Sequence, residues 1–257
     1  MSLDDLLATA LAMSEAARPV PLRYFRKPMA ITAKADASPV TLADRETERV
    51  MREVLAARVP EHGILGEEEG AARLDHRHVW VIDPIDGTRS FITGMPLFNN
   101  LVALLEDGVP LIGIVDTPAI GERYHAVMGR GAWFDGEPIT TSGCTGLEDA
   151  AVYRAGHAPT NAEHARRFER FAGIGRVNRY GYDAYAYALL ASGHVDLMLE
   201  TDLEPYDYLA LVPLVEAAGG VITDWQGGKL GLHSTGEVLA AATPELHAEA
   251  LARLNAA

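Results

Sequence analysis

Apolar residues recur at helical spacing in two segments near the start of the chain. Residues 3–17 carry leucines three and four positions apart, and the pattern stops before Pro19. Residues 41–58 carry a second apolar stripe, and Thr41 with Asp44 resembles a capping box in which Asp takes the place of the usual Glu. The pattern predicts two amphipathic helices, each with one face toward a core.

An almost wholly apolar run in the first half of the chain ends abruptly at Asp83. Such a run is typical of a strand buried on both faces. Pro84 fixes φ at about −65° and withholds a hydrogen-bond donor, so we expect the strand to end there. Gly87 then allows a tight turn, and Thr88 suits the start of a helix. Asp86 supplies a second acidic side chain in the turn between them.

Beyond this stretch, short apolar runs alternate with turn residues. Segments 106–108 and 135–136, which read Glu-Asp-Gly and Asp-Gly, are typical of hairpin turns. The alternation predicts an antiparallel meander. Its predicted strands are 101–105, 111–115, 123–127, 132–134 and 138–139.

The second half alternates strand patterns with helix patterns, which predicts a largely parallel sheet with helices on its faces. A segment rich in Thr, Ser, Gly and Asp, residues 140–149, separates the two halves. We therefore expect two domains, 1–142 and 143–257. The predicted elements of the second half are strands 151–154, 195–199, 221–223 and 238–241, and helices 162–171, 183–192, 208–218 and 245–254.

Composition narrows the class of protein. The 257 residues are 48% hydrophobic and 23% charged, as in a globular protein with a substantial core. The net charge of −14 argues against nucleic acid or an anionic membrane as a partner. Cys144 is the only cysteine, which favours a reducing cytoplasm. Asp4 and Asp5 do not fit a secretory signal, and no apolar run reaches the roughly 18 residues of a membrane helix.

Acidic side chains stand where predicted strands end or helices begin. Asp83 and Asp86 follow a strand and precede the free N–H groups of a helix start, and Glu67 and Asp207 occupy similar positions elsewhere. Carboxylates bind hard cations and helix N-termini bind anions, so a site with both suits a metal-bridged phosphate. The alternative is an ordinary turn at residues 83–88, with Glu67 and Asp207 as solvated loop acids or helix caps.

Three separated motifs favour the first interpretation: Gly66-Glu67-Glu68, Asp83-Pro84-Ile85-Asp86-Gly87-Thr88 and Pro205-Tyr206-Asp207. In this order they resemble the inositol monophosphatase family of magnesium-dependent phosphatases, and the resemblance covers nearly the whole chain. Residues 91–96 and 179–185 further resemble the histidinol-phosphate phosphatase branch of that family. The resemblance implies a layered α/β/α/β/α sandwich and a homodimer.

The resemblance also implies a set of metal ligands. These would be the side chains of Glu67, Asp83, Asp86 and Asp207 and the backbone carbonyl of Ile85, which would hold two or three Mg²⁺ ions. Oxygen ligands of this kind suit Mg²⁺, whereas zinc would call for His or Cys. Bound divalent ions would also reverse the sign of the local field, which otherwise repels a phosphate.

By the same resemblance, hydrolysis would proceed by a metal-activated water without a phosphoenzyme. Glu67 and Thr88 would orient that water, and Asp44 would hydrogen-bond the Thr88 hydroxyl. The phosphate would be held at Asp86 and by the backbone N–H groups of Gly87 and Thr88.

Three further carboxylates are candidates for binding the leaving group. Glu200 ends a predicted strand, and an acid at a strand's carboxyl end in such a sheet tends to face the crevice. Asp183 opens a predicted helix, where it either contacts the substrate or caps that helix. Glu204 is a third candidate, and the sequence does not place Asn99 and Asn100.

Two carboxylates aimed at the leaving group suit a cation better than a neutral polyol. Histidinol phosphate carries an ammonium and an imidazole, so the sequence favours a cytoplasmic histidinol-phosphatase of histidine synthesis. One alternative keeps the chemistry and changes the small phosphorylated substrate to inositol 1-phosphate, another sugar phosphate or a nucleotide 3′-phosphate. Another alternative is a non-catalytic regulatory protein that has kept the fold.

Overall fold

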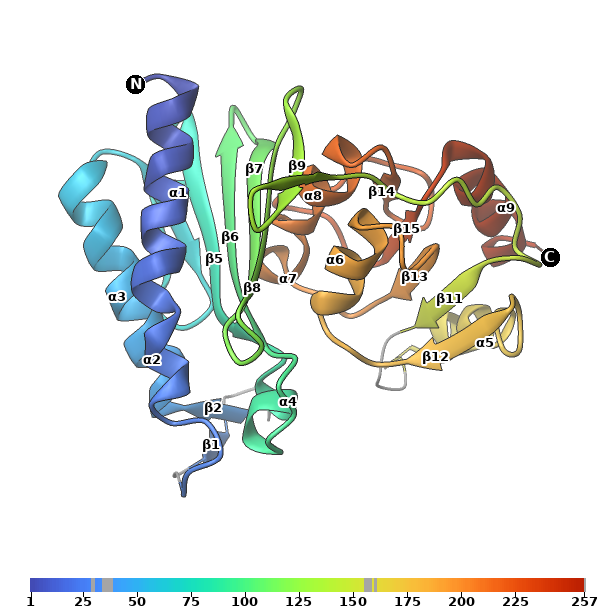
Figure 1. The fold of residues 1–257 in the computed structure, drawn as a ribbon, viewed down its shortest axis with the longest axis horizontal. Helices are drawn as coiled ribbons and strands as arrows, with labels where there is room; N and C mark the ends of the chain where they lie inside the picture. The colour runs from blue at the N-terminus through green and yellow to red at the C-terminus, as the bar shows by residue number, and fades with distance from the viewer. Residues whose placement is uncertain (29–30, 34–38, 155–158, 160, 257) are drawn as a thin grey trace.

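Two large β-sheets organise the protein (Figure 1). The computed structural model describes residues 1–28, 31–33, 39–154, 159 and 161–256. The larger sheet contains β3 (Gly63–Gly66), β4 (Gly70–Ala72), β5 (His78–Asp86), β6 (Asn99–Glu106), β7 (Val109–Thr117), β8 (Glu122–Val127), β9 (Gly131–Phe134) and β10 (Glu137–Ile139). The smaller sheet contains β11 (Ala151–Arg154), β12 (Val177–Tyr180), β13 (Leu197–Glu200), β14 (Val221–Thr223) and β15 (Val238–Ala241). A separate two-stranded ribbon pairs β1 (Ile31–Ala33) with β2 (Pro39–Thr41).

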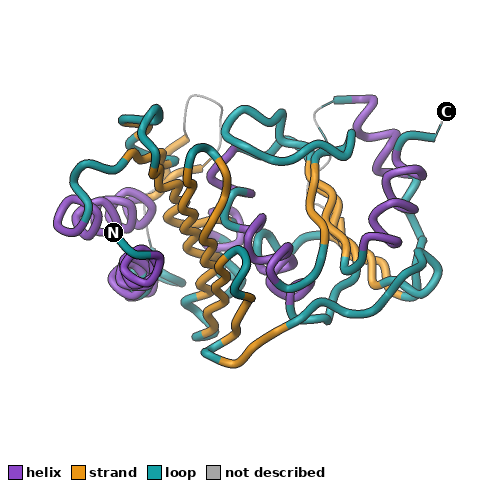
Figure 2. Tube along the Cα trace, turned by 90° about the horizontal axis from the view of Figure 1, so that it is seen from above, coloured by secondary structure: helices purple, strands orange, loops and turns teal. Residues whose placement is uncertain are grey.

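Helices cover both faces of both sheets, which gives five layers (Figure 2). Helices α1 (Leu3–Ala17) and α3 (Leu42–Arg58) pack on the outer face of the larger sheet. Helices α6 (Tyr185–Ala191) and α8 (Leu211–Ala217) lie between the sheets. The outer face of the smaller sheet carries α5 (Ala162–Glu169) and α9 (Pro244–Leu254), and the short helices are α2 (Pro19–Leu22), α4 (Thr88–Ile92) and α7 (Pro205–Tyr208). The predicted α/β/α/β/α sandwich is confirmed.

Strand β5 shows how the larger sheet serves two cores. Trp80 and Ile82 belong to the cluster under α1 and α3, whereas Val79 and Val81 belong to the cluster between the sheets. Successive side chains of a strand point to opposite faces, and both faces here are covered. The nearly continuous apolar run is therefore explained, and the prediction of a strand buried on both faces is confirmed.

The predicted N-terminal helices and the meander are also confirmed. Helix α1 has the expected bounds, and α3 begins at Leu42 with Thr41 as its N-cap. Asp44 Oδ2 accepts a hydrogen bond from the Thr41 backbone N–H at 2.8 Å, which completes the expected capping box. Strands β6 to β10 each pair antiparallel with the next along the chain.

The expected end of β5 at Pro84 is wrong. The strand continues to Asp86, and its pairing with β6 shifts register between Asp83 and Asp86, as at a β-bulge. A bulge takes up one extra residue and accommodates a proline, which has no N–H to donate to the ladder. The bulge lets both acidic side chains remain on the strand.

The expectation of a largely parallel second sheet is wrong in part. The sheet order is β12-β11-β13-β15-β14, and β15 runs antiparallel to both of its neighbours. A parallel neighbour needs a long crossover, usually a helix, and none of the helices lies between β14 and β15. Strand β12, which the sequence did not predict, pairs parallel with β11 at the other edge.

Two predicted helix starts are also wrong. The helix expected at 183–192 begins at Tyr185 with Ala184 as its N-cap, and Asp183 has a φ of 48° outside it. Asp183 is therefore not a cap. The helix expected at 208–218 is broken into α7 and α8, so Asp207 lies within the first turn of α7 instead of preceding a helix.

The segment 140–149 connects β10 of the larger sheet to β11 of the smaller sheet. The core between the sheets nevertheless takes side chains from both halves, including Val79 and Leu214. The division into domains 1–142 and 143–257 stays a prediction.

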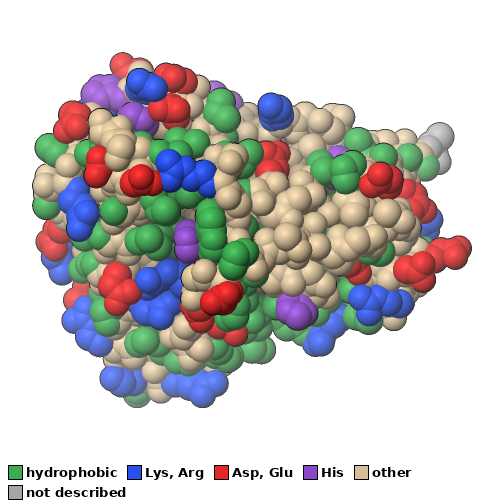
Figure 3. Space-filling model, turned by 45° about the horizontal axis from the view of Figure 1, so that its top comes forward, with side chains coloured by type: hydrophobic (Ala, Val, Ile, Leu, Met, Phe, Trp, Pro, Cys, Tyr) green, Lys and Arg blue, Asp and Glu red, His purple; other side chains and the backbone are tan. Residues whose placement is uncertain are grey.

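The helices and the surface add two observations. Within the described ranges, every helix is too short or too polar to cross a lipid bilayer. On the face that Figure 3 shows, acidic and basic side chains are interspersed and not gathered by sign.

Candidate metal centre

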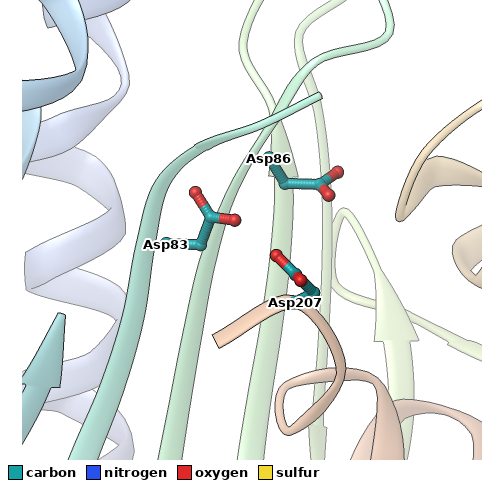
Figure 4. Close-up of side chains that lie close together, drawn as sticks. All are labelled: Asp83, Asp86 and Asp207. Atoms are coloured by element: carbon teal, nitrogen blue, oxygen red, sulfur yellow. The ribbon is translucent and has the colours of Figure 1, made fainter. Parts of the chain in front are cut away.

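Three carboxylates from two distant parts of the chain converge on one point. Asp83 and Asp86 come from the end of β5, and Asp207 comes from α7. One oxygen of each lies within 4.8 Å of the others, and Figure 4 shows the three side chains around a common space. Asp83 is buried, while Asp86 and Asp207 are half-buried. The convergence on which the metal prediction depends is present for these three residues.

Hydrogen bonds from the protein orient each of these carboxylates. Asp83 Oδ1 accepts from the backbone N–H of Ile85 at 3.0 Å, and Asp207 Oδ2 accepts from that of Glu204 at 2.7 Å. Asp86 Oδ2 accepts from Asn99 Nδ2 at 2.7 Å and from the backbone N–H of Ala184 at 2.9 Å. Each carboxylate is therefore held in place and still has lone pairs for another ligand.

Burial makes this cluster electrostatically unfavourable by itself. Burial raises the pKa of Asp83 well above its usual range, and the nearby charges of Glu67, Asp86 and Asp207 raise it further. Burial also raises the pKa of Asp86 and takes that of Asp207 to about 7. A divalent cation would offset this repulsion, and a site of oxygen donors suits a hard cation. The residues present therefore fit a metal centre.

Glu67 lies in the turn that follows β3, beside the three aspartates. It is not one of the three whose oxygens lie mutually within 4.8 Å. Its side chain is hydrogen-bonded to Asp83, and its charge raises the pKa of both Asp83 and Asp207. The structure thus places Glu67 at the edge of the centre, and its role as a metal ligand stays a prediction.

The Thr88 hydroxyl lies between two acceptors. It is 3.1 Å from the backbone carbonyl of Ile85 and 3.3 Å from Asp44 Oδ1. Asp44 is completely buried, and its other oxygen accepts from the Thr41 hydroxyl at 2.5 Å. The Asp44–Thr88 contact that the family resemblance implies is therefore present in the geometry.

Gly87 needs to be glycine for two reasons. Its φ of 77° is left-handed, and a Cβ there would lie 2.7 Å from Asp183 Oδ2. The turn brings the backbone of Gly87 and Thr88, which were predicted to hold phosphate, directly after Asp86.

The three predicted substrate carboxylates lie in different surroundings. Asp183 is brought against Gly87, and its Oδ2 accepts from the Ser90 hydroxyl at 2.5 Å. Glu200 is 8% exposed and accepts from the Tyr187 hydroxyl at 3.0 Å, and burial raises its pKa to about 8. Glu204 is exposed at the N-cap of α7. Asp183 thus lies directly against Gly87, one of the predicted phosphate residues.

Comparison with known proteins decides the family. The sequence model of the inositol monophosphatase family matches residues 2–257. The chain belongs to this family. It is therefore a phosphatase of a metal-dependent family that acts on small phosphorylated metabolites.

The relatives of this chain are named for different activities. The chain is 42% identical over 262 residues to "Bifunctional phosphatase IMPL2, chloroplastic" of Arabidopsis thaliana, covering 98% of this chain and 76% of that protein. It is 38% identical over 266 residues to a histidinol-phosphatase of Mycobacterium tuberculosis, covering 100% of both. An inositol monophosphatase structure from Zymomonas mobilis superimposes with a TM-score of 0.90 at 40% identity and covers 99% of both chains.

Within this family fold, the structure assigns a place to Asn99, which the sequence left open. Asn99 stands directly opposite Asp86 in the β5–β6 pairing, and it is completely buried. Its Nδ2 donates to Asp86, while its Oδ1 accepts from the Thr117 hydroxyl at 2.8 Å. Asn99 therefore orients an acidic residue of the centre. The available signal was a polar residue at the start of an otherwise apolar strand.

Proposed function

We propose that this phosphatase hydrolyses L-histidinol phosphate to L-histidinol and phosphate with Mg²⁺ as its metal. The observation that carries the proposal is Asp183, whose carboxylate lies against Gly87 and accepts a hydrogen bond from Ser90. A substrate whose phosphate lies at Gly87 and Thr88 would extend its leaving group toward this carboxylate. A cationic leaving group is favoured there over a neutral one.

Glu200 adds to this attraction only when a cation is close. Burial raises its pKa to about 8, so near neutral pH the side chain is mostly protonated. A neighbouring ammonium would lower that pKa and favour the ionised form. Asp183 therefore carries more of the argument than Glu200.

The residues of the centre fit hydrolysis by water. Mg²⁺ held by Asp83, Asp86, Asp207, Glu67 and the Ile85 carbonyl would supply a water of lowered pKa and neutralise phosphate charge. The Thr88 hydroxyl donates its proton to Asp44 or Ile85, which leaves its lone pairs to accept a hydrogen bond from the water. Thr88 and Glu67 can thus orient that water toward the phosphorus.

Inositol 1-phosphate is the second candidate substrate. An inositol-1-monophosphatase of Rhizobium meliloti is 34% identical over 206 residues, covering 77% of this chain and 76% of that protein. A polyol would use the same carboxylates as hydrogen-bond acceptors for its hydroxyls.

A comparison of the two substrates tests the proposal. With Mg²⁺ present, kcat/KM is expected to be about tenfold or more higher for histidinol phosphate, since a hydrogen bond to a charged group contributes roughly 1.5–3 kcal/mol. Phosphate release would be measured for both esters at several pH values. A higher kcat/KM for inositol 1-phosphate would overturn the assignment of substrate and leave the phosphatase chemistry intact.

Replacing Asp183 by Asn tests the residue itself. The change keeps a hydrogen-bond acceptor for Ser90 but removes the charge, so kcat/KM for histidinol phosphate should fall about tenfold or more. Turnover of p-nitrophenyl phosphate, whose leaving group carries no cation, should change about threefold or less. The matched control is Asp202→Asn, which makes the same charge change at an exposed residue that also has a positive φ. An equal loss on both substrates would contradict the assigned role.

A further inference from the structure

A buried glutamate on α3 holds the turn that carries Glu67. Glu48 is completely buried, and its two carboxylate oxygens accept three hydrogen bonds. Oε2 accepts from the backbone N–H of Glu68 at 2.7 Å, and Oε1 accepts from that of Glu69 at 3.0 Å. Oε1 also accepts from Arg52 Nε at 2.8 Å. Both backbone donors belong to the turn that links β3 to β4.

The turn lies beyond the β3–β4 ladder, and side chains of α3 hold it: Arg52 donates to the Gly70 carbonyl at 2.6 Å, and Glu48 accepts from two of its backbone N–H groups. Strands β3 and β4 pair as far as Gly66 and Gly70, so residues 67–69 lie beyond the ladder. A side-chain carboxylate that accepts two backbone N–H groups replaces the missing partners with charge-assisted hydrogen bonds. Glu67 is the first residue of this turn and contacts Asp83, so the position of the turn sets the position of the Glu67 carboxylate.

Gly66 makes room for this arrangement. A Cβ at residue 66 would lie 2.2 Å from Glu48 Oε1 and 2.6 Å from Glu48 Cδ. Glycine is therefore required here by the close approach of a buried carboxylate. The Gly66-Glu67 pair of the sequence motif combines the residue that admits Glu48 with the residue that Glu48 places.

We propose that Glu48 is a positioning residue for the metal centre. It acts through Glu67, without touching metal or substrate, by fixing the backbone of residues 67–69. The proposal rests on the proposed role of Glu67 as a metal ligand. The competing explanation is that Glu48 only stabilises α3, through its ion pair with Arg52 one helical turn away.

A double-mutant cycle on metal affinity separates these explanations. The dissociation constant of Mn²⁺ would be measured by calorimetry for the wild type, Glu48→Gln, Glu67→Gln and the double variant. Glu48→Gln is expected to weaken binding about 10–100-fold in the wild-type background. In the Glu67→Gln background it should change binding about twofold or less, because the residue through which Glu48 acts is gone. Equal losses in both backgrounds, or no loss in either, would overturn the proposal.

Glu53→Gln is the matched control for the cycle. It breaks another ion pair on α3, between Glu53 and Arg49, in which both side chains are exposed. Its Mn²⁺ affinity should equal that of the wild type. A loss as large as that of Glu48→Gln would show that any broken pair on this helix disturbs the centre, and would also overturn the proposal.

A measurement without metal tests the contact between Glu48 and the turn independently of the proposed function. Hydrogen exchange at the Glu68 and Glu69 amides should be slow in the wild type and about tenfold or more faster in Glu48→Gln. Gly66→Ala leaves both glutamates in the sequence. It should accelerate hydrogen exchange at the same two amides and weaken Mn²⁺ binding, and it replaces Glu48→Gln as the test if that variant does not fold. Unchanged exchange in these variants would refute the contact, whatever substrate the enzyme uses.

Discussion

Replacing Asp86 by Asn is expected to lower Mg²⁺-dependent phosphate release by on the order of 10³-fold or more, since metal-ion catalysis contributes several kcal/mol. Asp86 lies in the group of three converging carboxylates and directly before the turn predicted to hold phosphate. An amide oxygen remains to accept from Asn99 and Ala184, so the fold should be retained. The measurement is kcat with saturating Mg²⁺ and histidinol phosphate.

The same variant should be at least as stable as the wild type when metal is absent. Burial and the nearby charges of Asp183 and Asp207 disfavour the ionised form of Asp86. The substitution removes this ionisable group and so removes its repulsion with the other two carboxylates. Added Mg²⁺ should raise the melting temperature of the wild type more than that of the variant. Asp107→Asn, an equal charge change at an exposed turn residue, should behave as the wild type in both assays. Full activity in Asp86→Asn would remove this residue from the metal centre.

Local patterns in the sequence predicted most of the first half of the fold. Strand β5 and helix α3 were identified because each is fixed by its own periodicity, turns and caps. The antiparallel direction of β15 was not predicted, because direction depends on how the chain returns to the sheet and not on the strand itself. Strand β12, Val177–Tyr180, is mostly exposed at a sheet edge and has no apolar alternation to reveal it.

In the candidate site, too, the parts set by local sequence could be predicted and the parts that depend on the fold could not. The acidic motif at residues 83–88 is contiguous, so the turn at Gly87 and the helix start at Thr88 could be predicted locally. The continuation of β5 through a bulge to Asp86 could not. The residues that position the acidic side chains, such as Asn99 and Glu48, come from other strands and helices. Glu48 did leave a signal, because it stands three residues before Met51 and seven before Leu55, on the buried stripe of α3. A charged residue at such a position needs a buried partner, but only the fold shows that the partner is the Glu67 turn.

Replacing Glu200 by Gln is expected to stabilise the metal-free protein, by an amount that depends on pH. Burial raises the pKa of Glu200 from 4.5 to about 8. Below pH 4.5 the side chain is protonated in both the folded and the unfolded state, so wild type and variant should be equally stable. Between about pH 4.5 and 8 the unfolded wild type ionises while the folded state remains protonated, so wild-type stability falls relative to the variant. At pH 7 the difference should be on the order of 3 kcal/mol, because one pKa unit corresponds to about 1.4 kcal/mol.

Denaturant unfolding at pH 5, 7 and 9, with a chelator present, measures this difference. The gap should open between pH 5 and 8 and then level off, because above pH 8 Glu200 is ionised in both states. Tyr187→Phe removes the hydrogen bond that lowers the Glu200 pKa, and should extend the rise of the gap to higher pH. A stability difference that is constant across pH would mean that Glu200 is ionised in the folded protein near pH 7. In that case Asp183 and Glu200 would attract a cationic leaving group equally.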